Sequence, residues 1–353
     1  MRDTMPPVVE PTQAADRPLD VASPVRVGTR PFSPDDFPGC EAVRVPRDRI
    51  EDFEGRVEYW DARRELAMIV GAGSTLHHEW PAARLAAIAE RIAASRGLPI
   101  VAGGTADLVR RDKDGGIEVL MAADQFLFVR PLAGPELPER IDVERDPLPD
   151  VVLEVDHSTD ARRGKLGQYE RWGFPEVWID VPDAPWPGRP GSRASAATIY
   201  LLERGAYRIG ETSRAFPGFT AAEIHRAINE RFMSVETVAA LRRVGRLLGA
   251  AEGTGPDDDP WLKQERDEGR AEGRADMVRA ILQHRGLAIG GLFAERTHDL
   301  EALPKSAILQ AAMTCSDADD FFATLARLTA GIDPPLLKLH PLRRERGSEC
   351  SDQ

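Results

Sequence analysis

The sequence contains few of the features that mark secreted, disulfide-stabilised or membrane proteins. Its three cysteines, Cys40, Cys315 and Cys350, lie far apart, and this spacing predicts neither a disulfide framework nor a zinc knuckle. Because no run of about 18 uncharged apolar residues is present, we expect no membrane-spanning helix. The first residues include Asp3 and Glu10 and no apolar core, unlike a secretory signal. We therefore expect a cytoplasmic protein with no membrane partner.

An excess of positive charge is also absent, because 58 acidic residues outnumber 46 Lys and Arg and give a formal net charge of −12. Non-specific affinity for nucleic acid comes from Lys and Arg contacts to phosphates, so the balance argues against a surface covered with such contacts. It leaves room for a local basic groove. Basic residues do cluster in one short stretch, at Arg162, Arg163, Lys165 and Arg171.

The distribution of proline and apolar residues divides the 353 residues into four regions. Residues 1–42 are proline-rich and are predicted to form a disordered leader. Residues 43–232 carry strand and helix patterns and form the main predicted domain. Residues 233–335 form a helical C-terminal region, and residues 336–353 form a disordered tail.

Apolar spacing in the main domain predicts a mixture of strands and helices. We expect hairpins at 56–60 with 66–70, at 106–112 with 117–122 and at 198–203 with 206–209, and a strand at 124–129. Helices are expected at 80–95, 221–232 and 235–248. A further helix at 162–172, capped by Ser158 or Thr159, lies between strands at 148–156 and 175–181. A strand, a helix and a strand in this order form a crossover, which implies a partly parallel sheet.

The strand at 148–156 carries acidic residues in an apolar run. Side chains alternate between the faces of a strand, so Val152, Glu154 and Asp156 are predicted to share one face. Burying such carboxylates is costly unless a cation offsets their charge. Lys165 and Tyr169 lie four residues apart and therefore on the same face of the next helix. The pattern favours a metal site close to Glu154.

The residues from Pro149 to Val155, followed by Lys165, Tyr169 and the stretch from Gly173 to Trp178, resemble the Uma-type restriction endonuclease family. This family belongs to the PD-(D/E)XK nuclease superfamily, and the resemblance covers about residues 43–229. It implies an α/β fold with a restriction-endonuclease-like core, a mixed sheet flanked by helices, to which this chain adds a helical C-terminal appendage.

The resemblance also implies roles for individual residues. Asp124 matches the first metal-binding aspartate of the family, and Glu154 matches the second acid. Asp156 stands where many nucleases of the superfamily carry a lysine, and Lys165 supplies the lysine from the following helix. A further acid near the first helix completes many such sites, and Glu79 is a weak candidate for it. The supporting residues are Asp156, Tyr169 and Gln168.

These assignments imply an endonuclease that hydrolyses nucleic-acid phosphodiester bonds with Mg²⁺, or with Mn²⁺, as its cofactor. Oxygen ligands suit Mg²⁺, and Lys165 would orient the attacking water or offset charge in the transition state. DNA is the favoured substrate.

Simpler interpretations stay open for several residues. Asp124 could be a turn residue, Glu154 could pair with Lys165 without a metal, and Tyr169 could serve packing alone. Asp156 could bind a second metal or cap a helix, and Asp150 is interpreted as structural. At the level of the whole protein, the alternative function is a catalytically inactive nuclease-fold protein that acts as an assembly module through its helical tail.

The C-terminal region contains a repeat of Glu-Gly-Arg units from Glu268 to Arg274 that places Gly269 and Gly273 on one helix face. Glycine costs about 1 kcal/mol at a helix-interior position, so such a helix is expected to depend on a partner. It could be a charged spacer or a self-association surface, and a homodimer is one expected assembly. A capping box at Ser316 to Asp319 predicts a last helix that runs to Leu328.

Overall fold

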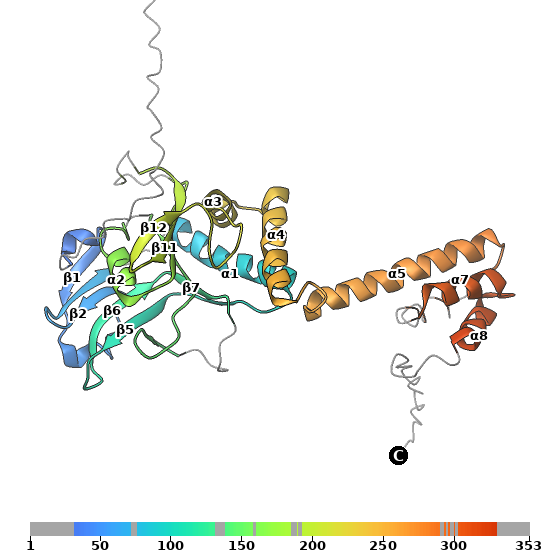
Figure 1. Ribbon diagram of the computed structural model, residues 1–353, viewed down its shortest axis with the longest axis horizontal. Coiled ribbons are helices and arrows are strands. Elements are labelled where there is room, and N and C mark those ends of the chain that lie inside the picture. The colour runs from blue at the N-terminus through green and yellow to red at the C-terminus, as the bar shows by residue number, and fades with distance from the viewer. Residues whose placement is uncertain are drawn as a thin grey trace, which may run out of the picture. The chain divides into compact units, whose positions relative to one another are not determined.

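The computed structural model describes residues 32–71, 76–130, 138–157, 160–184, 189, 193–289, 293, 296, 300 and 303–329. The chain forms two compact units, unit 1 (residues 1–256) and unit 2 (residues 257–353) (Figure 1). Residues 1–31 of the predicted leader, the predicted tail and the predicted caps Ser158 and Thr159 lie outside the described residues.

Unit 1 contains two mixed sheets. The first sheet has the strand order β1-β3-β2-β6-β5-β8. Its strands are β1 (Cys40–Arg44), β2 (Val57–Asp61), β3 (Leu66–Val70), β5 (Ala106–Arg111), β6 (Ile117–Ala123) and β8 (Ile141–Asp142). Of the three predicted hairpins, β2–β3 and β5–β6 lie in this sheet, and both are antiparallel.

The second sheet has the strand order β12-β11-β10-β9-β7-β4. Its strands are β4 (Val101–Gly103), β7 (Gln125–Phe128), β9 (Val151–Val155), β10 (Glu176–Val181), β11 (Ala196–Glu203) and β12 (Ala206–Gly210). Strand β9 is parallel to β10, as the predicted crossover through α2 (Lys165–Trp172) requires. Gly205 (φ 81°) supplies the left-handed conformation at the turn between β11 and β12.

Two helices cover one face of the second sheet, and a third helix packs against them (Figure 1). These helices are α1 (Leu76–Arg96), α3 (Ala221–Asn229) and α4 (Val235–Glu252). Val151, Leu153 and Val155 of β9 face them. Gly245 of α4 allows close packing against α1, because a Cβ there would lie 2.6 Å from the backbone oxygen of Ile92. Helix α4 therefore belongs to unit 1, whereas the sequence assigned it to the C-terminal region.

The opposite face of the second sheet packs toward α2 and the first sheet. Val152 of β9, Leu166 and Tyr169 of α2, and Tyr59 and Met121 of the first sheet share this core. The alternation predicted for the strand at 148–156 is thus confirmed from Val151 to Val155. Glu154 lies on the face that looks toward α2, and this arrangement positions the candidate site.

The first described residues differ from the expectation. The leader was predicted to extend to residue 42, but Ser33 caps a short 3₁₀ turn at Pro34–Asp36 and β1 pairs with β3 from Cys40 onward. Phe37 is 4% exposed. The burial of this aromatic ring stabilises the segment despite its prolines.

Unit 2 consists of helices packed on a core of their own. The helices are α5 (Pro260–His284), α7 (Lys305–Thr314) and α8 (Ala318–Thr329), and their core includes Val278, Ile308 and Phe321. The predicted repeat helix lies within α5. Helix α8 begins one residue later than a Ser316 cap requires, because the carboxylate of Asp317 accepts the backbone N–H of Asp320 at 2.8 Å. Over the described residues, no helix combines the length and apolar character needed to cross a membrane.

Candidate functional site

Lys165 lies at the centre of a buried group of acidic side chains. Its Nζ donates to Glu154 Oε2 at 2.8 Å and also contacts Glu58 Oε1. The side chains of all three residues are 3–9% exposed. The structure therefore brings together the predicted pair of Glu154 and Lys165 and adds Glu58 from β2.

Local structure explains how these groups meet. Glu154 lies on β9 at a position whose side chain points toward α2. Lys165 is the first residue of α2, so its side chain emerges close to the end of β9. Tyr169 lies one turn later, and its hydroxyl donates a hydrogen bond to Glu154 Oε1. Both carboxylate oxygens of Glu154 are thus held by side chains of a single helix.

Asp124 lies between β6 and β7, and β7 is the antiparallel neighbour of β9. Its Oδ2 accepts the backbone N–H of Val155 at 2.8 Å, and the residue is 6% exposed. Because Val155 follows Glu154, this bond fixes the carboxylate of Asp124 beside the group around Lys165. The interpretation of Asp124 as a simple turn residue does not account for this burial.

The charges of the group shift the pKa values of its members. Burial raises the pKa of Glu154, and the charges of Asp124 and Glu58 raise it further, while Lys165 opposes the shift. Burial lowers the pKa of Lys165, but Glu154, Glu58 and Asp124 outweigh that effect and the net shift is upward. Burial also raises the pKa of Tyr169, so its hydroxyl stays protonated and donates to Glu154.

The donor set and its charge fit a hard divalent cation. With Asp124, Glu154 and Glu58 ionised and Lys165 protonated, the group carries three negative charges and one positive charge. Such an excess is costly in a buried site, and a divalent cation would balance it. All the acidic ligands are oxygens, which suits Mg²⁺ or Mn²⁺.

Metal binding would require the acids to rearrange. In the described part of the chain, no three His, Cys, Asp or Glu side chains already form a ligand cluster. Lys165 Nζ bridges Glu58 and Glu154 instead, so a metal ion would have to displace the ammonium from at least one of these carboxylates.

Sequence reasoning missed Glu58 and named Glu79 in its place. Glu79 is in α1, its side chain is 51% exposed, and it pairs with Arg56 at 3.6 Å. Glu58 is buried and touches Lys165. The signal was an isolated acid in the apolar run from Val57 to Trp60, the same kind of pattern that identified Glu154.

Asp156 belongs to a separate group of charges. Its Oδ1 accepts the backbone N–H of Ala161 at 2.8 Å, and Arg193 pairs with its carboxylate. Burial raises its pKa to about 7, although Arg193 opposes the shift. These contacts support the helix-capping interpretation over a second metal ligand, because the carboxylate holds the turn that precedes α2.

Two other sequence assignments are also located. Gln168 is buried, and its Oε1 accepts a hydrogen bond from Arg171 at 2.5 Å, so it positions a basic side chain. Asp150 accepts the backbone N–H groups of Val129 and Arg130 at 2.8 and 3.0 Å. It therefore ties the start of β9 to the end of β7, which agrees with a structural role.

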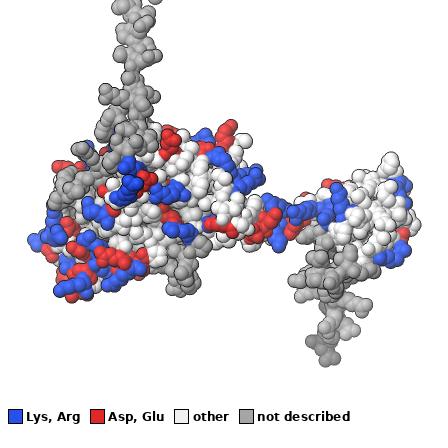
Figure 2. All heavy atoms as spheres, viewed as in Figure 1, with Lys and Arg blue, Asp and Glu red and all other residues white. Residues whose placement is uncertain are grey.

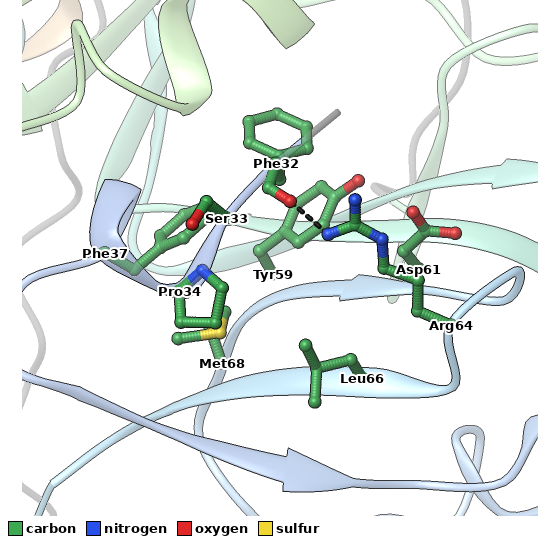
Figure 3. A pocket seen from close by; sticks show the side chains of 9 residues that line it. All are labelled: Phe32, Ser33, Pro34, Phe37, Tyr59, Asp61, Arg64, Leu66 and Met68. Atoms are coloured by element: carbon green, nitrogen blue, oxygen red, sulfur yellow. Dashed lines mark hydrogen bonds between the residues drawn. The ribbon is translucent and has the colours of Figure 1, made fainter. Parts of the chain in front are cut away.

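The N-terminal segment packs beside this region. Phe32 and Phe37 stack around Tyr59 of β2, and the backbone oxygen of Phe32 accepts a hydrogen bond from Arg64 (Figure 3). A Cβ added to Gly164, at the start of α2, would lie 3.1 Å from the Phe37 ring. The segment thus covers the end of α2 that carries Lys165.

A second polar cluster surrounds His225 of α3. Its Nδ1 lies 2.6 Å from Asp180 Oδ1 and its Nε2 lies 3.2 Å from Ser195 Oγ, the order found in serine hydrolases. However, Asp183 Oδ1 lies 3.1 Å from the same Nε2 and also accepts a hydrogen bond from Ser195. Burial lowers the pKa of His225, but the two carboxylates outweigh it and raise the pKa. His225 is therefore held as a double donor, which makes it a poor base for Ser195.

Comparison of the chain with protein-family models, curated proteins and solved structures found no match.

Proposed function

We propose that unit 1 is a metal-dependent endonuclease that hydrolyses phosphodiester bonds in nucleic acid, with DNA as the favoured substrate. The observation that carries this proposal is the buried ammonium of Lys165 held between Glu154 and Glu58, with Asp124 fixed on the neighbouring strand. The resemblance of the β9–α2–β10 sequence to the Uma-type family and the PD-(D/E)XK superfamily supports it.

Asp124, Glu154 and Glu58 would hold Mg²⁺ or Mn²⁺. Such a cation supplies Lewis-acid polarisation of the phosphoryl group and makes a water molecule easier to deprotonate. Lys165 keeps its proton because three acids surround it, so it can donate to a phosphoryl oxygen and stabilise the charge that develops there. Tyr169 acts as a positioning residue, since its hydroxyl orients the Glu154 carboxylate.

The substrate must reach a site whose side chains are 3–9% exposed. Access therefore requires a covering part of unit 1 to move. The segment that carries Phe32 and Phe37 lies against the start of α2, which makes it one such cover. On the visible face of unit 1, basic and acidic side chains are interspersed (Figure 2), so phosphate contacts would come from local arginines rather than from the net charge.

The test compares cleavage of plasmid, single-stranded DNA and RNA in Mg²⁺, in Mn²⁺ and in a chelator. The variants are Lys165→Ala and Glu154→Gln, and the matched controls are Lys263→Ala on α5 and Asp150→Asn directly before β9. The controls alter a lysine outside unit 1 and a buried acid that precedes β9 and is bound by the backbone N–H groups of Val129 and Arg130 and by the Arg130 side chain. Thermal unfolding of every variant separates loss of chemistry from loss of folding.

We expect the wild type to cleave in a metal-dependent manner. Both site variants should reduce the cleavage rate by at least about 100-fold, the usual cost of removing a group that stabilises transition-state charge. The controls should retain it. Cleavage that survives in folded Lys165→Ala and Glu154→Gln would place the activity elsewhere, and an inert wild-type protein would contradict the proposal.

One observation favours a second candidate function. Both oxygens of Glu154 are already bound, one by Lys165 and one by Tyr169, as in a purely structural ion pair. A catalytically inactive nuclease-fold protein that assembles through its helical C-terminal region would retain this pair. That candidate predicts no cleavage, and it predicts that removing residues 257–353 changes the oligomeric state while Lys165→Ala does not.

A further inference from the structure

A pocket of about 610 Å³ opens between the first turns of α1, the loop after β10 and the end of α3. Its volume falls within the range of about 300–1,000 Å³ that is usual for small-molecule and cofactor sites. The lining is mixed, with apolar walls and a few polar groups: Trp80, Pro81, Pro182, Asp183, Ala184, Asn229 and Arg231. None of these residues belongs to the group around Lys165.

Aromatic and cationic side chains gather at this pocket. Trp80 is 39% exposed although it is the largest apolar side chain of the lining. Arg84, one helical turn later, lies over its ring at 5.9 Å. Arg231 lies over the ring of Phe232 at 5.5 Å, and Phe232 is 78% exposed. Exposed aromatic rings next to arginines are typical of surfaces that stack unpaired bases and contact phosphates.

Buried hydrogen bonds hold the polar side chains of the pocket in place. Asp180 is fully buried and accepts hydrogen bonds from His225 and from the amide of Asn229 at 2.6 and 2.9 Å. His225 in turn holds Asp183 through its Nε2 at 3.1 Å. The hydrogen bonds that Asp183 makes to described residues use Oδ1, so Oδ2 can accept a hydrogen bond from a ligand. The positive charge of His225 offsets one of these carboxylates.

We propose that this pocket binds an unpaired nucleotide of a single-stranded nucleic acid. Its base stacks on Trp80, an amino group on the edge of the base donates to Asp183, and Arg231 and Arg84 contact the adjacent phosphates. A duplex would not fit in the same way, because its bases are stacked on one another and are not free to face Trp80. This inference deepens the proposed function and rests on it, since it assigns single-stranded regions as the part of the substrate that unit 1 grips.

The experiment measures binding of a fluorescein-labelled oligodeoxycytidylate of about ten nucleotides, within the usual site size for single-stranded binding, to the full chain by anisotropy. Each cytosine carries the amino group that the proposed contact to Asp183 requires. A chelator prevents cleavage, and a duplex of the same length is the comparison ligand. The variants are Trp80→Ala, Trp80→Phe and Arg231→Ala. Trp261→Ala is the matched control, because Trp261 is 71% exposed but belongs to α5 of unit 2.

We expect the single strand to bind more tightly than the duplex. Trp80→Ala should weaken binding by about 5- to 150-fold, the range for loss of one stacking residue, and Trp80→Phe should restore most of it. Arg231→Ala should weaken binding and reduce the salt dependence by about one phosphate contact. Trp261→Ala should bind as the wild type does.

Equal binding by Trp80→Ala, Arg231→Ala and Trp261→Ala would overturn the inference, and so would a preference for duplex or a failure of the wild type to bind the oligonucleotide. These outcomes are distinct from failure of the proposed function. If the protein binds the oligonucleotide through Trp80 but does not cleave, the inference about the pocket stands and the proposed nuclease function fails. If the wild type and Trp80→Ala cleave equally well, only the inference about the pocket fails.

Discussion

Replacing Lys165 with methionine is the most informative change to the stability of unit 1. Methionine has a similar length and no charge, so it fills the space of the lysine stem and removes only the ammonium. Glu154 and Glu58 would then be buried without their shared cation. Removal of one partner of a buried ion pair costs about 3–5 kcal/mol, and we expect Lys165→Met to lower the free energy of unfolding by that amount at a pH above about 8, the raised pKa of Glu154 in the wild type.

A second substitution separates this charge effect from a loss of packing. In the double variant Lys165→Met/Glu154→Gln, the glutamine is neutral, and the Tyr169 hydroxyl can still donate to its Oε1. We expect the double variant to regain at least about 2 kcal/mol relative to Lys165→Met, because one uncompensated buried charge is gone. The coupling between the two positions in a double-mutant cycle measures this term.

The pH dependence of stability provides an independent test of this charge effect. The pKa of Glu154 in the folded protein is raised above its ordinary value of 4.5, so the native state binds more protons than the unfolded state. Stability from this group therefore increases as pH falls from the raised pKa toward 4.5. Lys165 opposes the shift, so its removal should extend this pH dependence to higher pH in Lys165→Met than in the wild type, and Glu154→Gln should abolish the difference.

Urea unfolding followed by tryptophan fluorescence measures these free energies. Five of the six tryptophans lie in unit 1, and Trp261→Phe removes the remaining signal from unit 2. A cost below about 1 kcal/mol for Lys165→Met, the size expected for an exposed pair, would refute the reasoning. So would a double variant no more stable than the single one.

Three further predictions concern the scaffold and are measured by urea unfolding. Gly245→Ala should destabilise unit 1 by about 1–3 kcal/mol through its clash with α1, whereas Gly269→Ala in the open part of α5 should stabilise that helix by up to about 1 kcal/mol; equal effects would contradict the packing argument. Arg96→Met should cost about 2–3 kcal/mol, because it breaks the paired hydrogen bonds between the ends of α1 and α4 at Glu252; an unchanged midpoint would refute this. The free energy of unfolding of the wild type should decrease as pH rises from 3.8 toward about 7, because burial raises the pKa of Asp156. Asp156→Asn should make this decrease smaller; an unchanged slope would show that Asp156 does not cause the decrease.

The sequence predicted the parts of the fold that depend on local periodicity. Strand β9 shows the expected alternation because one face meets the helices and the other meets α2, and Lys165 and Tyr169 share a helix face because they are four residues apart. The hairpins β2–β3 and β5–β6 followed from apolar runs that lie close together in the chain. These features depend on short-range geometry, which a single sequence carries.

The remaining features depend on tertiary contacts. The alternation argument placed Asp156 with Glu154, but β9 ends at Val155 and the chain turns, so Asp156 meets Arg193 instead. Glu58 lies about 100 residues before Lys165, and nothing local in β2 indicates which strand it faces. The burial of Phe37 against Tyr59 likewise could not be inferred from a proline-rich segment.

The central claim, that the acids around Lys165 form a metal centre, is tested most directly by Mn²⁺ binding followed by electron paramagnetic resonance of the free ion. The wild-type protein should bind Mn²⁺ at a site from which Mg²⁺ displaces it. Glu58→Gln and Glu154→Gln should each weaken that binding by at least about tenfold, as loss of a metal-ligand partner does, while Asp150→Asn should bind normally. No binding by the wild type, or equal binding by all four proteins, would contradict the account.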